Sequence, residues 1–213
     1  MVIVLLVSIS LGSVAIPIDE IIAILLGNNS SKSSWSTIIL HFRLPKAITA
    51  MLVGSGLSIA GLLMQTLFKN PLAGPFVLGI SSGASLGVAI LILGAGIFGG
   101  VLTTVSFSSW GLAIASSLGA AIVLLAVLIT AHKVKNTMSI LIIGLMFGTV
   151  TSAIISVFTF FSNADKIQQF VFWGFGSLGN LSWNEILVFF IIYLISILTL
   201  LNVIKHLNTF LLG

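Results

Sequence analysis

Arg43 and Lys46 are the residues best suited to chemistry with a partner, because they flank Leu44 and Pro45 at the start of a long uncharged run. Side chains three residues apart on a helix face the same way, so the two cations can act together. They would stand at the positive end of the helix dipole, where an exposed cation costs about 0.3–1 kcal/mol. This cost favours a binding role, in which the pair docks carboxylates of an external partner. Snorkelling to lipid headgroups is the alternative.

Other kinds of chemistry find no support in the sequence. It has no cysteine, and its histidines lie far apart at the ends of apolar runs, at positions His41, His132 and His206, so no metal site is expected. It has no Gly-x-x-x-x-Gly-Lys-Ser/Thr loop, which excludes ATP binding in the P-loop manner. No ionisable residue lies in the centre of an apolar run, which weakens proton-coupled transport. We therefore expect a protein that is not an enzyme, needs no cofactor, and takes energy for any uphill transport from another chain.

Small residues recur at helical spacing along three of the apolar runs. The three sets are Gly54, Ser58, Gly61 and Gln65; Gly79, Gly83 and Gly87; and Gly144 and Gly148. Small residues let helix backbones approach closely in lipid. The sets therefore predict either helix packing or the lining of a translocation path. Between the first two sets, Asn70 can cap a turn and Pro71 can occupy the first turn of the next helical segment.

The composition places these elements in a membrane. The 213 residues are 58% hydrophobic and 6% charged, whereas a soluble domain carries roughly 25% charged residues. The net charge of +4 is too sparse for nucleic-acid binding. Apolar runs predict six spans, at about 2–15, 47–68, 76–98, 110–131, 138–161 and 183–204. The last five reach the roughly 20 residues that a span needs. The first is short, which suggests a clipped N-terminus. A signal peptide ending near Ala15 is the alternative, against which the missing basic segment argues.

The connecting segments and their charges predict an orientation. Residues 17–26 read as a short amphipathic helix on the outer interface, 28–36 as a polar loop, and 170–183 as a short outer segment rich in glycine and aromatics. One face of the six spans then carries only cations, at Lys69, Lys133, Lys135 and Lys205. The other face carries four positive and four negative residues. Net charge makes the first face cytoplasmic, although Lys and Arg alone are equally divided between the faces.

Several short motifs in the segment 43–87 resemble the FecCD family, which comprises permease subunits of ABC importers for iron–siderophores, haem and cobalamin. These motifs are Arg43-Leu-Pro-Lys46, Gly61-Leu-Leu-Met-Gln65, Asn70-Pro-Leu-Ala-x-Pro75 and Leu78-Gly-Ile-Ser-Ser-Gly-Ala84. The resemblance continues more loosely through Trp173-Gly-x-Gly-Ser-Leu178 to the end of the chain.

The resemblance implies a ten-helix permease that works as a homodimer or with a paired permease, together with ATPase subunits and an external solute-binding protein. It places Arg43 and Lys46 outside, where they would meet glutamates of the binding protein, and the Asn70-Pro71 turn inside. Lysine at position 46 keeps the charge but lacks the bidentate geometry of arginine. The family's fifth helix, here residues 138–161, would line the path.

The expectation is therefore an all-α membrane bundle, six helices of a probable ten, in one permease domain spanning 1–213 that stops before the loop that grips the ATPase. It would lie in the bacterial inner membrane, among lipid, and import an iron chelate or cobalamin. Two alternatives stay open, a secondary carrier or channel without an ATPase and a membrane scaffold that transports nothing.

Overall fold

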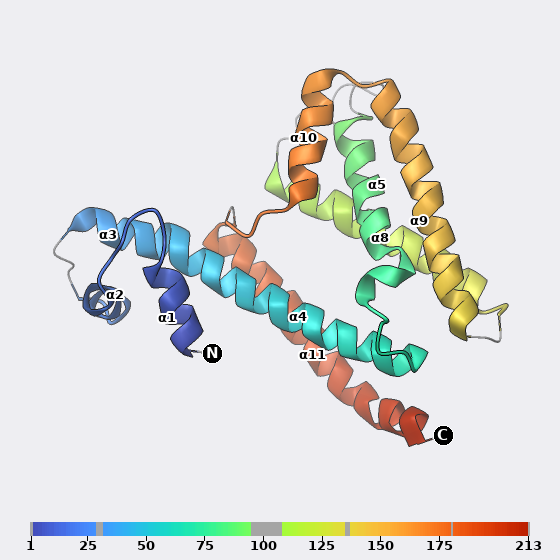
Figure 1. Ribbon diagram of the computed structural model, residues 1–213, viewed down its shortest axis with the longest axis horizontal. Helices are drawn as coiled ribbons and strands as arrows, with labels where there is room; N and C mark the ends of the chain where they lie inside the picture. The colour runs from blue at the N-terminus through green and yellow to red at the C-terminus, as the bar shows by residue number, and fades with distance from the viewer. Residues whose placement is uncertain (1, 29–31, 95–107, 135–136, 180, 213) are drawn as a thin grey trace. The chain divides into compact units, whose positions relative to one another are not determined.

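The computed structural model describes residues 2–28, 32–94, 108–134, 137–179 and 181–212, and within these ranges it contains helices and no strand. The elements are α1 (Val2–Ser10), α2 (Ile18–Leu25), α3 (Ser33–Ile38), the π-helical turn η1 (Ile39–Arg43), α4 (Leu44–Phe68), the 3₁₀ helix η2 (Pro75–Leu78), α5 (Ile80–Ile92), α8 (Ser109–Ala131), α9 (Thr137–Phe160), α10 (Ala164–Phe175) and α11 (Trp183–Leu212) (Figure 1). The prediction of an all-α membrane protein is confirmed.

Four helical stretches of the described chain are long and apolar enough to cross a membrane. They are Ser33–Phe68, Ser109–Ala131, Met138–Phe160 and Trp183–Lys205. A helix satisfies most of its backbone hydrogen bonds internally, which is what a lipid-facing segment requires. The predicted count of six is only partly supported. The first predicted span holds only the nine-residue helix α1, and α5 has 13 residues. The end of the predicted span 76–98 lies outside the described residues.

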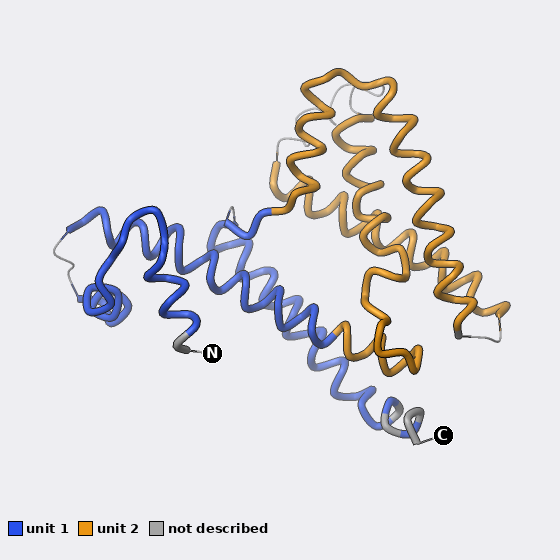
Figure 2. Tube along the Cα trace, in the orientation of Figure 1, with its two compact units in different colours: residues 1–59, 177–213 blue, residues 60–176 orange. Residues whose placement is uncertain are grey.

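The chain divides into two compact units, one of residues 1–59 and 177–213 and one of residues 60–176 (Figure 2). Helix α4 continues from the first unit into the second. The single permease domain expected from the sequence stays a prediction.

The core of the first unit lies where α1 and α2 meet the helix that contains η1. Its buried members are Ile9, Ile16, Ile21, Ile24, Ile39 and Ala47. Helix α2 follows the prediction for 17–26, with acids in its first turn and Gly27, at φ 83°, after its end. Within α2, Ile21 and Ile24 are buried, whereas Ile18, Ile22 and Leu25 are exposed.

Pro45 lies inside a continuous helix that begins at Ser33, and this is the main departure from the sequence-based expectation. A proline has no N–H for the carbonyl four residues earlier, and its ring clashes with that carbonyl. The wider turn η1 immediately before Leu44 accommodates the ring without breaking the helix. Residues 33–36, expected in a polar loop, therefore form the start of a helix of 36 residues.

The second unit is built around α5, which packs against α8 and α9, while α10 also contacts α5. The turn that leads into α5 is formed by local hydrogen bonds. Asn70 Oδ1 accepts the N–H of Leu72 at 2.9 Å, and Lys69 has a φ of 47°. Pro75, rather than Pro71, occupies the first turn of the next helical segment, which is the 3₁₀ helix η2.

Helix α10 includes residues 170–175, the first part of the outer segment expected at 170–183. Its 12 residues begin at Ala164, directly after Asn163 in extended conformation, and carry Asp165 in the first turn. An acid near a helix N-terminus is stabilising. Gly176, at φ 72°, follows the helix where only glycine is unstrained.

Candidate functional site

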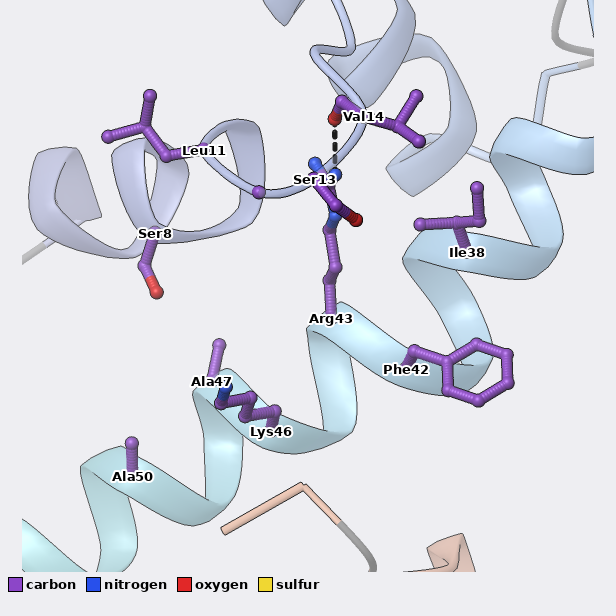
Figure 3. A pocket seen from close by; sticks show the side chains of 11 residues that line it. Ser8, Leu11, Ser13, Val14, Ile38, Phe42, Arg43, Lys46, Ala47 and Ala50 are labelled. Atoms are coloured by element: carbon purple, nitrogen blue, oxygen red, sulfur yellow. Dashed lines mark hydrogen bonds between the residues drawn. The ribbon is translucent and has the colours of Figure 1, made fainter.

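The guanidinium of Arg43 is held by backbone carbonyls at the end of α1. Its Nη1 donates to Ile9 O at 2.7 Å and to Ser10 O at 3.0 Å. Its Nη2 donates to Val14 O, which is the hydrogen bond drawn in Figure 3. The last carbonyls of a helix have no partner within the helix. Arg43 therefore caps α1 and ties the segment after it to the long helix.

This geometry corrects the electrostatic argument made from the sequence. Arg43 and Lys46 do not stand at a helix N-terminus, because α3, η1 and α4 run on continuously from Ser33. Arg43 instead lies at the C-terminus of α1, where the helix dipole is negative and a cation is stabilising. The charge of Arg43 thus has a structural reason.

Arg43 and Lys46 line one cavity of about 690 Å³ within the first unit. Arg43 is half-buried and Lys46 is exposed. The remaining lining residues are Ser8, Leu11, Gly12, Ser13, Val14, Ile38, Phe42, Ala47 and Ala50. A Cβ atom on Gly12 would lie 2.6 Å from Arg43 Nη2, so this glycine gives the guanidinium its room. The sequence analysis correctly predicted that the two cations lie together. It did not predict that Gly12 and the residues next to it, after α1, complete the cavity.

Two hydrogen bonds join α11 to the long helix within the first unit. Trp183 Nε1 donates to Leu40 O at 3.1 Å, and Tyr193 OH donates to Ser55 Oγ at 2.9 Å. Leu40 lies in η1, where the π-helical turn shifts the backbone pairing. An interfacial tryptophan and a lone tyrosine were visible in the sequence, but their partners were not.

The glycines of the second unit lie where helix backbones come closest. A Cβ on Gly83 would lie 2.6 Å from Gly119 O, and one on Gly87 would overlap Ala115 O. A Cβ on Gly144 would likewise lie too close to a backbone atom, at 2.3 Å from Val77 O. These contacts are close helix packing between α5 and α8 and between α9 and η2.

The other members of the two sets have more room or a special backbone. Gly79 has a φ of 75°, which side chains rarely adopt, and a Cβ there would lie 3.1 Å from Gly144 O. A Cβ on Gly148 would approach Ser82 Oγ at 3.2 Å, so that this position is only moderately tight.

The α4 set has a different environment. Nothing lies within 4 Å of where a Cβ on Gly54 or Gly61 would stand, and Ser58 and Gln65 are exposed. The hydroxyl of Ser58 donates to Gly54 O of its own helix at 2.8 Å. This face of α4 is open, whereas the glycines of α5 are packed.

The sequence analysis did not identify the residues of α8 against which the α5 glycines pack. Gly111, Ala115 and Gly119 recur at intervals of four in α8, and the backbones of Ala115 and Gly119 are the ones that Gly83 and Gly87 of α5 approach. The same spacing argument that selected Gly79, Gly83 and Gly87 would have selected them. Among the described residues, no group of three or more His, Asp or Glu could hold a metal ion.

Together these observations define a class of protein, a multi-pass helical membrane protein with glycine-mediated packing and a cationic site on the long helix Ser33–Phe68. The chain belongs to the FecCD transport family, whose model matches residues 1–213. The resemblance seen in the sequence is confirmed, and the family is one of transport permeases. The expected localisation, as a multi-pass protein of the bacterial inner membrane, is supported by this membership and by the apolar helices.

Named relatives agree with this assignment. The chain is 39% identical over 165 residues to the "Probable iron chelatin transport system permease protein" of Helicobacter pylori, covering 77% of this chain and 47% of the relative. It is 33% identical over 161 residues to the "Vitamin B12 import system permease protein BtuC" of an Escherichia coli strain, covering 73% and 47%. The chain thus spans about half the length of the curated relatives it matches.

A solved structure matches the whole chain. The structure described as "An inward-facing conformation of a putative metal-chelate type ABC transporter" superposes with a TM-score of 0.80 at 27% identity, covering 100% of this chain and 62% of that one.

Proposed function

We propose that this chain acts as a permease subunit of an ABC importer for an iron chelate or cobalamin. The observation that carries the proposal is the family match over residues 1–213. The two relatives described above are named for iron chelatin and for vitamin B12, so the cargo class is a large metal complex.

The proposal divides the work among several chains. ATP hydrolysis takes place on a separate ATPase subunit, a second permease subunit completes the path, and an extracytoplasmic binding protein delivers the cargo. The sequence supports this division, because it contains no P-loop that could bind ATP. In this arrangement the turn at Asn70 and Pro71 faces the cytoplasm.

The open face of α4 and the exposed face of α9 are proposed as parts of the translocation path. Gly54, Ser58, Gly61 and Gln65 line the α4 face, on which small and weakly polar groups leave room for cargo. Helix α9 offers exposed Met146, Ser152 and Ser156. The closely packed glycines of α5, by contrast, hold the bundle together.

Lys46 is proposed as the cation that docks the binding protein, with Arg43 holding the surrounding segment in place. Lys46 is exposed, whereas the guanidinium of Arg43 already donates to three carbonyls. Both would lie on the outer face, where carboxylates of a binding protein are the complementary groups. This assignment keeps the predicted pair but gives its members different tasks.

Lys46→Glu is expected to slow association with the cognate binding protein by on the order of tenfold at low salt, because a surface charge that steers encounter acts mainly on the on-rate. Surface plasmon resonance at several salt concentrations measures this rate. Lys46→Arg keeps the charge and should associate normally, and Lys133→Glu reverses a cation elsewhere as a control. An on-rate unchanged by Lys46→Glu at low salt would remove Lys46 from the docking site.

Transport in proteoliposomes tests the proposed function as a whole. Uptake of an iron chelate or cobalamin should require ATP, the ATPase and the loaded binding protein together. Uptake driven by an ion gradient without an ATPase would favour a secondary carrier. Binding of the partners without any uptake would favour a scaffold.

A further inference from the structure

The cavity beside Arg43 and Lys46 has the lining of a site for an amphiphile. Apolar side chains of Leu11, Val14, Ile38 and Phe42 make up much of its wall, and the labelled cations stand among them in Figure 3. Ser8 and Ser13 add hydroxyls. Its volume of about 690 Å³ falls within the roughly 300–1,000 Å³ typical of small-molecule sites.

The charged residues that line the cavity are all positive. The 11 lining residues include two cations and no Asp or Glu. A guanidinium has five N–H donors, and the three hydrogen bonds of Arg43 all go to neutral carbonyls, so no carboxylate neutralises its charge within the cavity lining. Lys46 adds a second full charge at the exposed rim. An anion with an apolar portion complements this lining.

The length of the helix places the cavity at a membrane surface. No charged residue lies between Lys46 and Lys69, and the apolar part of α4 from Ala47 to Phe68 is about 33 Å long at 1.5 Å per residue. That length matches the hydrocarbon core, which is about 30 Å thick. Lys46 and the cavity therefore lie at the level of the lipid headgroups.

A tryptophan marks the same level independently. Trp183 donates its indole N–H to Leu40 O, which lies within about two turns of Lys46 on the same helix. Tryptophans concentrate at the interface between membrane and water. The cavity thus opens where phosphodiesters of lipids are found.

We propose that this cavity binds the headgroup of an anionic phospholipid, with the phosphate between Arg43 and Lys46 and the upper part of an acyl chain along the apolar wall. Arginine and lysine both bind phosphate, through charge-assisted hydrogen bonds. The proposal does not rest on the transport function, since it concerns the chain without ATPase or binding protein. Lys46 can serve one anion at a time, so a bound lipid and a docking carboxylate compete for it.

Native mass spectrometry of the purified chain in a non-ionic detergent tests the proposal, with phosphatidylglycerol and phosphatidylcholine offered in equal amounts. The chain should retain phosphatidylglycerol selectively. Lys46→Ala should lower this retention by about fivefold, the effect of one lysine at an anionic surface. Lys46→Arg should retain the lipid, and Lys133→Ala should behave as the unaltered chain.

Three results would overturn the proposal. One is equal retention of the two lipids, or retention unaffected by Lys46→Ala in a chain with unchanged thermal stability. Another is full displacement of phosphatidylglycerol by excess inorganic phosphate, which would show a site for free anions. The third is loss of binding-protein association in Lys46→Ala while lipid retention is unchanged, which would reserve this cation for the protein partner.

Discussion

Gly83→Leu is expected to prevent stable packing of α5 against α8. A Cβ at this position would already lie 2.6 Å from Gly119 O and 2.8 Å from Val123 Cβ, and these are backbone and β-branched atoms that cannot move aside cheaply. Overpacking typically costs about 1–3 kcal/mol and occasionally more, and leucine adds three further carbons to the clash. We expect little folded protein in detergent, measured by fluorescence-detected size-exclusion chromatography.

Graded variants separate this packing effect from a general intolerance of substitution. Gly83→Ala should lower the thermal midpoint clearly, because the first carbon alone makes the clash. Gly174→Ala is the matched control, since nothing lies within 4 Å of its Cβ position in α10. Alanine there should be neutral or slightly stabilising, because it is a better helix former than glycine. Normal abundance of Gly83→Leu would show that α5 and α8 do not pack in this way.

Arg43→Ala is expected to free the α1–α2 segment from the long helix. It removes the donors to Ile9 O, Ser10 O and Val14 O at once. Hydrogen bonds from charged donors contribute about 1.5–3 kcal/mol each, and since the three share one side chain we expect a loss of about 3 kcal/mol in total. Hydrogen exchange should show faster exchange of the α1 and α2 amides, with the α5–α8 amides unchanged.

Two neighbouring variants sharpen this test. Lys46→Ala removes a cation from the same cavity, but its exposed side chain should leave exchange in α1 unaltered. Arg43→Lys keeps the charge and loses the forked geometry, so an intermediate rate is expected. If Arg43→Ala left the α1 and α2 amides as protected as before, the capping role would be refuted.

Composition and spacing predicted most of the helices because lipid permits few alternatives. A run of apolar residues in a membrane must satisfy its own backbone, so the runs near 110–131, 138–161 and 183–204 appear as α8, α9 and α11. The start of the long helix could not be placed in this way. Pro45 and the polar residues 33–36 argued for a break, whereas the structure has a π-helical turn there, in which Leu40 O accepts a hydrogen bond from Trp183.

Of the residues that form the candidate site, the sequence analysis predicted only the two cations. Arg43 and Lys46 were selected from their types and spacing, but their tasks differ because α1 ends beside one of them. That contact joins residues 34 apart in the sequence, and spacing rules carry no information about such pairs. The same limit applies to the glycines. Spacing selected Gly83, but only packing shows that it faces Gly119 while Gly54 faces open space.

The most direct test of the account is uptake into proteoliposomes that contain this chain as it occurs in the cell, its neighbouring ATPase and its binding protein. We expect accumulation of an iron chelate or cobalamin that requires ATP hydrolysis and the loaded binding protein, and that stops when either is left out. Accumulation driven by an ion gradient alone, with neither ATPase nor binding protein present, would contradict it.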